Sequence, residues 1–593
     1  MQFKLEKAGQ DAVAERGTAV ARQLPHLPDD PIDELIWSSF ARLTRGASPL
    51  AFATAWFDFL AHMSVSPGRR RRLATEAGTR MAEAWMRTVS ELATPQQADA
   101  TSQATRFERA LSSFSQAYDG WTDWLTEACQ TPNGVSRANA RRVAFSVRQM
   151  MEAAHPRNLY WMNGDALRAT REEQGRNLLR GWSHLLEDLA KSEIFETRRK
   201  TAPPELGRRL AVTPGRVVYR NRLIELIQYE PATSQVASEP VLFVPAWIMK
   251  YYILDLTPGH SLIEYLVSQG FTVFAISWRN PDADDRDLGF DDYRTLGVLA
   301  ALDAIEALVP ETPVHTVGYC LGGTLLSVAA AGLARDGDHR IASLTLLAAQ
   351  TDFSEAGELT LFIDEAQLTA LEAGMASRGY LDGTQMAGAF SVLRSRELLW
   401  RRMQEAYFLG QRGELIDLMI WNGDHTRMPS RMHSEYLRRF FLHNDFVNGR
   451  ILVDDRPAAI SDIRAPIFAL GTTKDHVAPW RSVFKIHLFA DTDVTFALTN
   501  GGHNAGIVSP PGHPRRRHHI FTKADEEHFI DPDAWLERAE ERNGSWWPSW
   551  SEWLKQRSSG TAPARVPAFA KLDTNRLANA EALPVAPGTF VFE

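Results

Sequence analysis

Short apolar runs alternate with helical patterns along the second half of this chain, and this alternation limits the folds that it can adopt. The runs have the length of buried strands, and the segments between them have the spacing of helices. Strands that alternate with helices form a mostly parallel sheet with helices on both faces. We expect the strands at 217–219, 223–229, 241–244, 272–276, 314–317, 343–347, 467–470 and 494–498.

The first part of the chain follows a different pattern. Residues 1–205 are rich in Ala, Leu, Arg, Glu and Gln, which favour helices, and the segment 178–189 repeats Leu and Trp at helical spacing. Pro203 and Pro204 interrupt this pattern. We therefore expect a helical N-terminal domain over 1–205 and an α/β domain over 206–593.

The expected sheet is interrupted between its strands at 343–347 and 467–470. The intervening segment, about 352–460, is too long for a simple connection, and its pattern is mostly helical. Open α/β folds place their ligands at the carboxyl ends of the parallel strands. We therefore expect this segment to form a helical cap over that edge of the sheet.

Composition excludes several classes of protein. The 593 residues carry a formal net charge of −8, without the basic field that nucleic-acid-binding proteins usually have. The two cysteines, Cys129 and Cys320, are too few for a disulfide framework, so a reducing compartment is favoured. No secretory signal and no apolar run of transmembrane length appear. We expect a cytoplasmic protein without a transmembrane segment.

The segment Gly318-Tyr-Cys-Leu-Gly322 has the spacing of the nucleophile elbow G-x-S-x-G, with Cys in place of Ser. The nucleophile of such an elbow lies on a sharp strand-to-helix turn, and its glycines relieve crowding. The N-terminus of the following helix would stabilise a thiolate. We predict that Cys320 is the nucleophile of an α/β-hydrolase fold. The alternative is a buried structural cysteine, which is how we interpret Cys129.

Two loops at the same sheet edge supply candidates for a base and its partner. In the α/β-hydrolase fold the acid follows the nucleophile and the histidine comes last. Asp475 follows the expected strand at 467–470, and His503 follows the strand at 494–498. The rival His476 is adjacent to Asp475 and should point away from it, and His425 lies in the expected cap. The order predicts a triad of Cys320, His503 and Asp475.

The backbone provides candidate donors for an oxyanion hole. The N–H of Leu321 follows the nucleophile directly, and a second donor usually comes from the loop after the first buried strand. In this chain that loop offers Ala246, Trp247 and Ile248. No metal-binding motif and no glycine-rich phosphate loop appear, so we expect neither a metal nor a cofactor. The candidate substrate contacts are Trp421, Tyr319 and Met249.

Longer strings in a fixed order surround these residues. They are Trp247-Ile-Met-Lys-Tyr-Tyr-Ile-Leu-Asp-Leu256, Ser277-Trp-Arg-Asn-Pro-Asp282, Gly318-Tyr-Cys-Leu-Gly-Gly323, Trp421-Asn-Gly-Asp424, Lys474-Asp-His-Val-Ala-Pro-Trp480, Gly502-His-Asn-Ala-Gly506 and Gly544-Ser-Trp-Trp-Pro548. From about residue 150 onwards the chain resembles the polyhydroxyalkanoate synthases, specifically their single-chain class I type. Where that family commonly has Pro-Pro-Trp-Ile-Asn-Lys, this chain has Pro245-Ala-Trp-Ile-Met-Lys250.

The resemblance implies that the chain polymerises (R)-3-hydroxyacyl-coenzyme A thioesters into a polyester and releases coenzyme A. It also implies a homodimer on the surface of intracellular polyester granules. Cys320 would be the acylated nucleophile, His503 the base and Asp475 its partner. Two alternatives stay open. One is a cysteine hydrolase, either a thioesterase or a depolymerase, that uses water as the acceptor. The other is a catalytically silent granule-coat protein.

Overall fold

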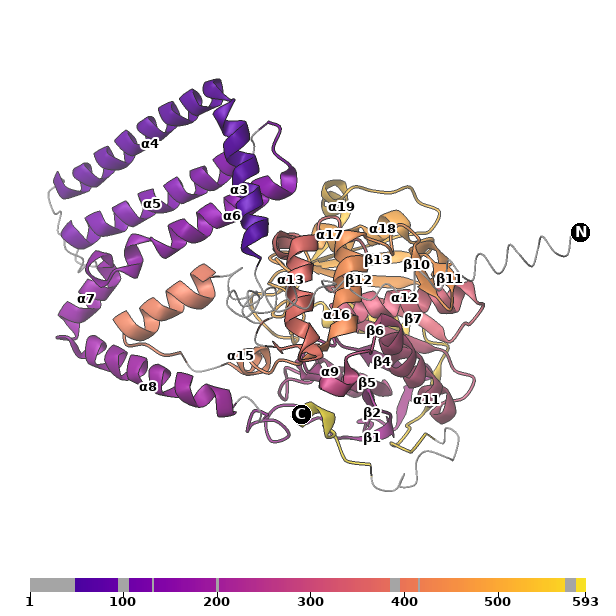
Figure 1. The fold of residues 1–593 in the computed structure, drawn as a ribbon. Coiled ribbons are helices and arrows are strands. Elements are labelled where there is room, and N and C mark those ends of the chain that lie inside the picture. Colours follow the sequence, from indigo (N-terminus) through magenta and orange to yellow (C-terminus); the bar gives the residue numbers. More distant parts are fainter. Residues whose placement is uncertain are drawn as a thin grey trace, which may run out of the picture. The chain divides into compact units, whose positions relative to one another are not determined.

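The chain forms two compact units in the computed structural model (Figure 1). The model describes residues 48–93, 106–130, 133–198, 202–383, 385, 395–413, 416–570 and 583–593. Among these, residues 202–383, 385, 416–570 and 583–593 belong to unit 1. Residues 48–93, 106–130, 133–198 and 395–413 belong to unit 2.

Unit 2 consists of helices, as the N-terminal composition predicts. They are α3 (Pro49–Ser64), α4 (Pro67–Ala93), α5 (Arg106–Gln130), α6 (Arg137–Ala153), α7 (Gly164–Glu172) and α8 (Arg176–Arg198), with the short helices η1 (Pro156–Asn158) and η2 (Tyr160–Met162). From later in the chain come η7 (Arg396–Arg401) and η8 (Gln404–Phe408). A small core of Ala55, Phe59, Cys129, Val143 and Ala144 holds α3, α5 and α6 together. Cys129 is therefore a packing residue, and burial raises the pKa of its thiol to about 11.

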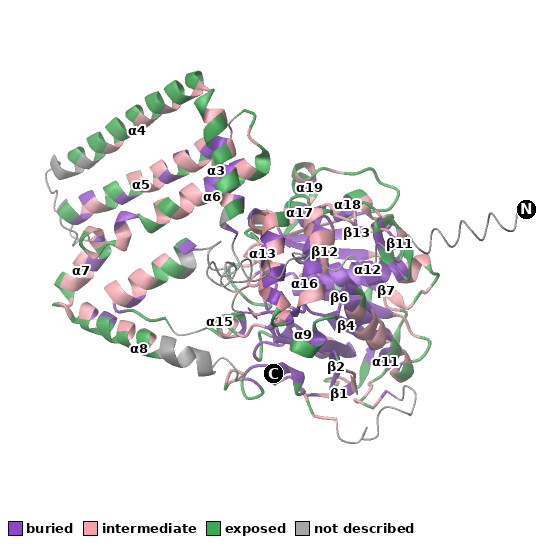
Figure 2. Cartoon of the chain, viewed as in Figure 1, coloured by how far each residue is buried: buried purple, intermediate pink, exposed green. Residues whose placement is uncertain are grey.

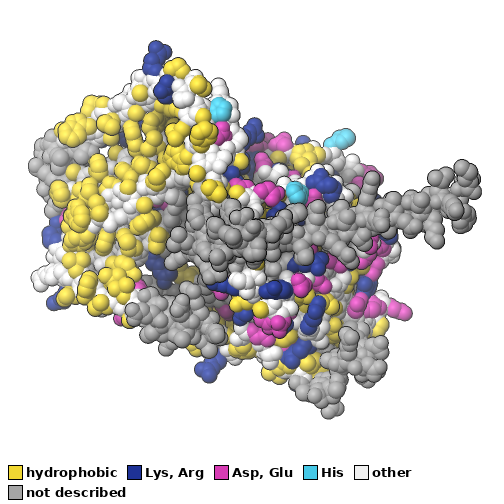
Figure 3. Space-filling model, in the orientation of Figure 1, with side chains coloured by type: hydrophobic (Ala, Val, Ile, Leu, Met, Phe, Trp, Pro, Cys, Tyr) yellow, Lys and Arg dark blue, Asp and Glu magenta, His cyan; other side chains and the backbone are white. Residues whose placement is uncertain are grey.

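Helix α8 carries the repeat of Leu and Trp that predicts an amphipathic helix. The helix is present, but Leu179, Trp182 and Leu186 are 75%, 62% and 49% exposed. Figure 2 shows long exposed stretches on α4 and α8, and Figure 3 shows hydrophobic side chains gathered on the surface of this unit. Unit 2 thus presents apolar side chains to its surroundings.

Unit 1 is built on a 10-stranded sheet. Its order is β1 (Gly215–Arg220), β2 (Ile224–Tyr229), β5 (Val273–Trp278), β4 (Val241–Val244), β6 (Val314–Tyr319), β7 (Ile341–Leu347), β12 (Ile467–Thr472), β13 (Val494–Thr499), β14 (Arg517–Lys523) and β15 (Glu540–Asn543). The central strands from β5 to β13 are parallel, and antiparallel strands flank them on both sides. Each expected apolar run lies on one of these strands, so the expected α/β-hydrolase fold is confirmed.

Helices cover both faces of this sheet because successive residues of a strand point to opposite sides. On one face, α20 (Trp547–Lys555) places Trp553 so that its indole N–H donates to Thr495 Oγ1 at 2.9 Å. The next residue of β13, Phe496, faces the other way and packs against Phe484 of α17 (Trp480–Phe484), with ring centroids 5.0 Å apart. Burial on both faces explains why these strands read as continuous apolar runs.

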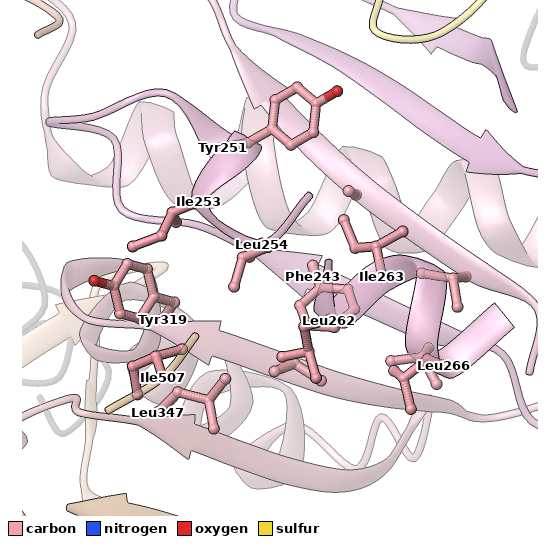
Figure 4. Close-up of a cluster of buried hydrophobic side chains, with 14 of the residues drawn as sticks. Phe243, Tyr251, Ile253, Leu254, Leu262, Ile263, Leu266, Tyr319, Leu347 and Ile507 are labelled. Carbon is pink, nitrogen blue, oxygen red and sulfur yellow. The ribbon is translucent and has the colours of Figure 1, made fainter. Parts of the chain in front are cut away.

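A large apolar core that includes Trp550 and Trp553 lies on the α20 face of the sheet. Figure 4 shows part of this core. It joins Phe243 of β4 to Leu262 and Leu266 of α9 (Leu262–Ser268) and continues to Tyr319 and Ile507. Tyr319 precedes the predicted nucleophile, and Ile507 follows the loop that carries His503. The core therefore supports the strand ends on which the predicted site is built.

The strands β14 and β15 have no counterpart in the sequence prediction. Prolines and basic residues precede His518 and His519, a composition typical of an exposed loop, but the structure places both histidines on a strand. His518 lies on β14, is buried, and uses its two ring nitrogens to contact the Gly544 carbonyl and the Ser549 hydroxyl. The residues of β15 are all exposed, so this edge strand carries no apolar pattern.

The segment predicted as a cap is mostly helical where the structure describes it. In unit 1 it contributes η6 (Gly357–Phe362), α13 (Glu365–Ala376), α15 (Asp417–Asn422), α16 (Ser430–Tyr436) and η9 (Leu437–Leu442). Its residues 395–413 belong to unit 2 instead. Among the described helices, none is long and apolar enough to span a membrane.

Candidate active site

Cys320 occupies the turn between β6 and α12 (Leu321–Arg335). Its backbone has φ 53° and ψ −124°, a conformation that residues other than glycine rarely adopt. Its N–H donates to the Leu347 carbonyl at 2.9 Å, which ties the turn to the neighbouring strand. The strained geometry of a nucleophile elbow is therefore present at the residue that the motif predicts.

The glycines of the elbow permit close approach of the backbone. A Cβ on Gly322 would lie 2.1 Å from the Val244 carbonyl oxygen, at the end of β4. A Cβ on Gly318 would lie 2.3 Å from the Cα of Gly323. Any larger residue at either position would push the helix away from the sheet. The crowding also places the elbow against the loop that follows β4.

His503 and Asp475 meet at the carboxyl ends of adjacent parallel strands. Asp475 follows β12 and His503 follows β13, and the distance from His503 Nδ1 to Asp475 Oδ2 is 2.7 Å. The other Asp475 oxygen accepts hydrogen bonds from the N–H groups of Val477 and Ala478 at 2.9 and 2.8 Å. These bonds fix the carboxylate, which in turn orients the imidazole. His503, and not the adjacent His476, is thus the histidine that contacts Asp475.

The charges around His503 favour its protonated form. Burial by itself lowers the pKa of His503, but the negative charges of Asp475 and Cys320 outweigh it and hold the pKa well above its ordinary value. Hydrogen bonds to both neighbours act in the same direction. Because Nδ1 faces Asp475, Nε2 is the nitrogen left for Cys320. The arrangement suits a thiolate–imidazolium pair.

Two backbone segments next to Cys320 hold the candidate oxyanion donors. Leu321 is the first residue of α12, so its N–H precedes the internal hydrogen bonds of that helix. On the other side, Thr426 donates to the carbonyl of Trp247 through its hydroxyl at 2.9 Å and to that of Ile248 through its N–H at 3.4 Å. These contacts fix the loop between β4 and η3 (Tyr251–Ile253) beside the elbow.

Comparison with known proteins gives this geometry a family. Residues 99–266 match the model of the poly-beta-hydroxybutyrate polymerase (PhaC) N-terminus, and residues 239–510 match the alpha/beta hydrolase fold. The chain is 40% identical over 470 residues to the poly(3-hydroxyalkanoate) polymerase of Methylorubrum extorquens, covering 79% of this chain and 76% of that one. The chain belongs to the poly(3-hydroxyalkanoate) polymerase family.

Further relatives agree with this assignment. The polymerase subunit PhaC of Rhizobium meliloti is 39% identical over 76% of this chain and 73% of its own. The corresponding protein of Cupriavidus necator is 36% identical over 76% of this chain and 75% of its own. The resemblance to polyhydroxyalkanoate synthases is therefore confirmed, and the relatives support the single-chain type. Residues 27–69 also match a poly-beta-hydroxybutyrate polymerase N-terminal model.

In this polymerase-family chain, the three candidate substrate contacts lie in different surroundings. Tyr319 precedes Cys320, and its ring centroid lies 5.7 Å from that of His503. Met249 is partly buried, and its sulfur lies 3.4 Å from His425 Nδ1. Trp421 is buried in the core, and its indole N–H donates to the Lys250 carbonyl at 2.8 Å. Trp421 therefore contacts the loop that follows β4.

Several side chains around the triad are absent from the sequence prediction. Tyr436 of α16 packs against Trp247, with ring centroids 5.7 Å apart, and the pKa of its hydroxyl is raised first by burial and then by the charge on Cys320. The Tyr319 hydroxyl donates to Asn504 Oδ1 at 2.7 Å. Arg516 donates to the carbonyls of Asn500 and Ala505, on either side of His503. Asn504 could have been found from the sequence, because it directly follows His503 in the string Gly502-His-Asn-Ala-Gly506. No sequence pattern points to Tyr436 or Arg516.

Proposed function

We propose that this chain is an acyltransferase that polymerises (R)-3-hydroxyacyl-coenzyme A thioesters into polyhydroxyalkanoate and releases coenzyme A. Cys320 is the nucleophile, His503 the acid and base, and Asp475 its orienting partner. The observation that supports this proposal most directly is the contact between His503 and Asp475, with His503 also coupled to Cys320. The family membership supports the choice of polymerisation among the reactions open to such a triad.

The proposed cycle begins with acylation of Cys320. The thiolate attacks the carbonyl carbon of the thioester, and a tetrahedral oxyanion forms. The C–S bond to coenzyme A then breaks, and the leaving thiolate takes the proton from His503. The products of this half-reaction are free coenzyme A, an acyl thioester on Cys320 and neutral His503. Exchange between two thioesters is nearly balanced, so loading is reversible.

The second half-reaction forms the ester bond. The hydroxyl of another acyl unit attacks the Cys320 thioester, and its proton passes to neutral His503. The C–S bond to Cys320 breaks, so the thiolate and the imidazolium are restored while the chain is one unit longer. Transfer from sulfur to oxygen is downhill and drives the reaction towards polymer. The cap excludes water, because hydrolysis of the thioester would otherwise compete with growth.

The backbone N–H of Leu321 and one from the loop after β4, at Trp247 or Ile248, stabilise the oxyanion in this proposal. Donors fixed in advance act most strongly where charge develops in the transition state. The contacts of Thr426 and the close approach of Gly322 support the placement of that loop. Tyr319, Met249 and Trp421 are proposed to contact the substrate or to shape the site around it.

The wider setting is also part of the proposal. The enzyme works as a homodimer in the cytoplasm, on the surface of intracellular polyester granules, as the family resemblance implies. Residues 1–205 form the N-terminal domain, 206–593 form the catalytic domain, and about 352–460 form its cap. The exposed apolar side chains of α8 support contact with an apolar polymer.

Two other functions share parts of this site. A thioesterase or depolymerase would use the same triad with water as the acceptor, and a granule-coat protein would use none of it. The deciding experiment incubates the purified chain with (R)-3-hydroxybutyryl-coenzyme A, then measures coenzyme A release and sizes the product. We expect coenzyme A together with high-mass polyester. Free hydroxy acid alone would indicate a hydrolase, and no release would favour the coat protein.

A further inference from the structure

Lys250 is a buried lysine at the end of the segment that carries the candidate oxyanion donors. We call this segment, residues 245–250, the oxyanion loop. Lys250 is 3% exposed, and its ammonium group donates to the main-chain oxygens of Phe590 and Glu593 at 3.1 and 3.0 Å. A buried ammonium group costs free energy unless such bonds replace its water. The two partners lie 340 and 343 positions away in the sequence.

The partners of Lys250 are themselves held in place. Glu225 of β2 is fully buried, and its carboxylate accepts hydrogen bonds from the N–H groups of Thr589 and Phe590 at 2.8 and 3.0 Å. Its second oxygen accepts the Thr589 hydroxyl at 2.8 Å. Gly588 has φ +84°, and a Cβ there would lie 2.3 Å from the Glu225 carboxylate. We call residues 588–593 the strap.

The strap also reaches the end of β5 and the base of the cap. The backbone N–H of Asn280 donates to a side-chain oxygen of Glu593, and its side-chain amide donates to the main-chain oxygen of Glu593, both at 3.2 Å. The Asn280 side-chain oxygen accepts the N–H of Arg427 at 2.9 Å. Since Glu225 pairs with Ser277 in the sheet, all of these contacts lie at the carboxyl ends of the parallel strands.

The contacts of the oxyanion loop determine the orientation of its peptide planes. The carbonyls of Trp247 and Ile248 accept from Thr426, and the carbonyl of Lys250 accepts from Trp421. A peptide unit is planar and trans, so fixing the Trp247 carbonyl fixes the N–H of Ile248. Lys250 completes this set, because its side chain joins the end of the loop to the strap.

We propose that Lys250, held by the strap, positions the oxyanion loop for catalysis. The role of the loop rests on the proposed function, whereas the physical claim concerns only its backbone. Lys250 is a positioning residue in this account, since it acts through the peptide N–H groups of the loop. Loss of the link leaves the triad intact but loosens the donors. The effect falls on the transition state, and substrate binding changes little.

The test uses the full chain with Lys250→Met, which keeps most of the side-chain volume and removes the ammonium group. Asn280→Ala is the second variant, because it removes a hydrogen bond to the strap without changing the charge of the chain. The control is Lys555→Met, at an exposed position at the end of α20. Hydrogen exchange is measured over residues 246–249 and over α12, beside kcat and KM for coenzyme A release.

We expect Lys250→Met to raise amide exchange in the oxyanion loop at least about tenfold and to leave α12 unchanged. We expect kcat, calculated per molecule whose Cys320 can be acylated, to fall about 10- to 100-fold. KM should stay within about twofold of that of the unsubstituted chain, because small misplacements of catalytic groups reduce the rate at this scale. Asn280→Ala should give the same pattern at smaller size, and Lys555→Met should match the unsubstituted chain.

Unchanged exchange in the loop of Lys250→Met would overturn the proposal. So would a rise in exchange across all of unit 1, because that would make Lys250 a residue of general stability. A chain that releases no coenzyme A even without substitution would refute the proposed function alone. Exchange in the oxyanion loop does not depend on activity, so it still decides whether the strap positions that loop.

Discussion

At the scale of single residues, the site depends on the carboxylate of Asp475, both oxygens of which accept hydrogen bonds. Asp475 accepts from two backbone N–H groups and from His503. Its side chain has no exposed surface, so water cannot replace a lost partner. The orientation of His503 therefore follows directly from Asp475. This makes Asp475 the residue at which a change of a single atom has the largest expected effect, apart from the proposed nucleophile Cys320.

We predict that Asp475→Asn lowers kcat for coenzyme A release about 10²- to 10⁴-fold, the range known for triads that lose their orienting carboxylate. The amide nitrogen would face an N–H donor in either orientation, so the imidazole loses its correct tautomer. The control is Asp491→Asn, whose exposed carboxylate pairs with Arg464 on the surface. Activity of Asp475→Asn within tenfold of the unsubstituted chain would contradict the assigned role.

The raised pKa of His503 predicts a pH dependence of stability. Protonated His503 stabilises the fold fully below its ordinary pKa of 6.5, and this contribution is lost as the pH rises towards the higher folded value. The free energy of unfolding should therefore fall across that window. Removing the Cys320 charge lowers the folded pKa, so Cys320→Ala should show a smaller fall. Denaturant unfolding at a series of pH values measures both, and identical profiles would contradict the coupling.

At the scale of elements, the elbow depends on a strand and a helix that touch through glycines. We predict that Gly322→Ala destabilises unit 1 by about 1–3 kcal/mol or prevents folding, because its Cβ would overlap the Val244 carbonyl. The control is Gly78→Ala in α4, where no atom of the described residues beyond the adjoining backbone of α4 lies within 4 Å of the new Cβ. Gly78→Ala should stabilise its helix by about 0.5–1 kcal/mol. Thermal unfolding followed by circular dichroism compares the two.

The elements show which structural features can be read from sequence. The central strands are buried on both faces, so they appear as apolar runs, and their order alone brings Cys320, Asp475 and His503 to one edge. The strands β14 and β15 lie at the border of the sheet. All residues of β15 are exposed and β14 has no continuous buried run, so neither strand appears as an apolar run in the sequence. Hydrogen bonding with β13 makes them strands, and no local pattern records that pairing.

The supporting contacts of the site are hidden from sequence for a related reason. Lys250 contacts Phe590, and Tyr319 contacts Asn504, across 340 and 185 positions. Residue spacing describes neighbours along one helix or strand, and strand order places the three triad candidates at one sheet edge. Neither predicts contacts between residues this far apart in the sequence. The meeting of the three triad candidates at one sheet edge was therefore predictable, whereas the residues that hold them in place emerge only from the fold.

At the scale of the whole molecule, the chain combines a catalytic unit with a helical unit of unusual surface. Leu179, Trp182 and Leu186 are exposed on α8, although apolar residues at helical spacing normally face a core. A product that is itself apolar supplies a surface on which such residues can be buried. The proposed granule association thus gives these side chains a function without altering the fold of unit 2.

We predict that replacing Leu179, Trp182 and Leu186 together by Gln weakens binding to polyester granules at least about tenfold, because apolar contact area is lost. Folding should be unaffected, since all three side chains are already exposed. Co-sedimentation with purified polyester particles measures the binding. The control replaces Arg71 and Glu83 of α4, two exposed charged residues, by Gln. Equal binding of both variants would contradict a role for α8 in attachment.

The central claim is that the acyl group of the substrate is transferred to Cys320, and mass spectrometry of the acylated enzyme tests it most directly. The chain is mixed with (R)-3-hydroxybutyryl-coenzyme A, quenched in acid within the first turnover and digested. We predict an acyl adduct on the peptide that contains Cys320, and the same adduct in Cys129→Ala. The Cys320→Ala chain should show neither the adduct nor release of coenzyme A. An adduct on Cys129 or on a hydroxyl residue, or continued release by Cys320→Ala, would contradict the account.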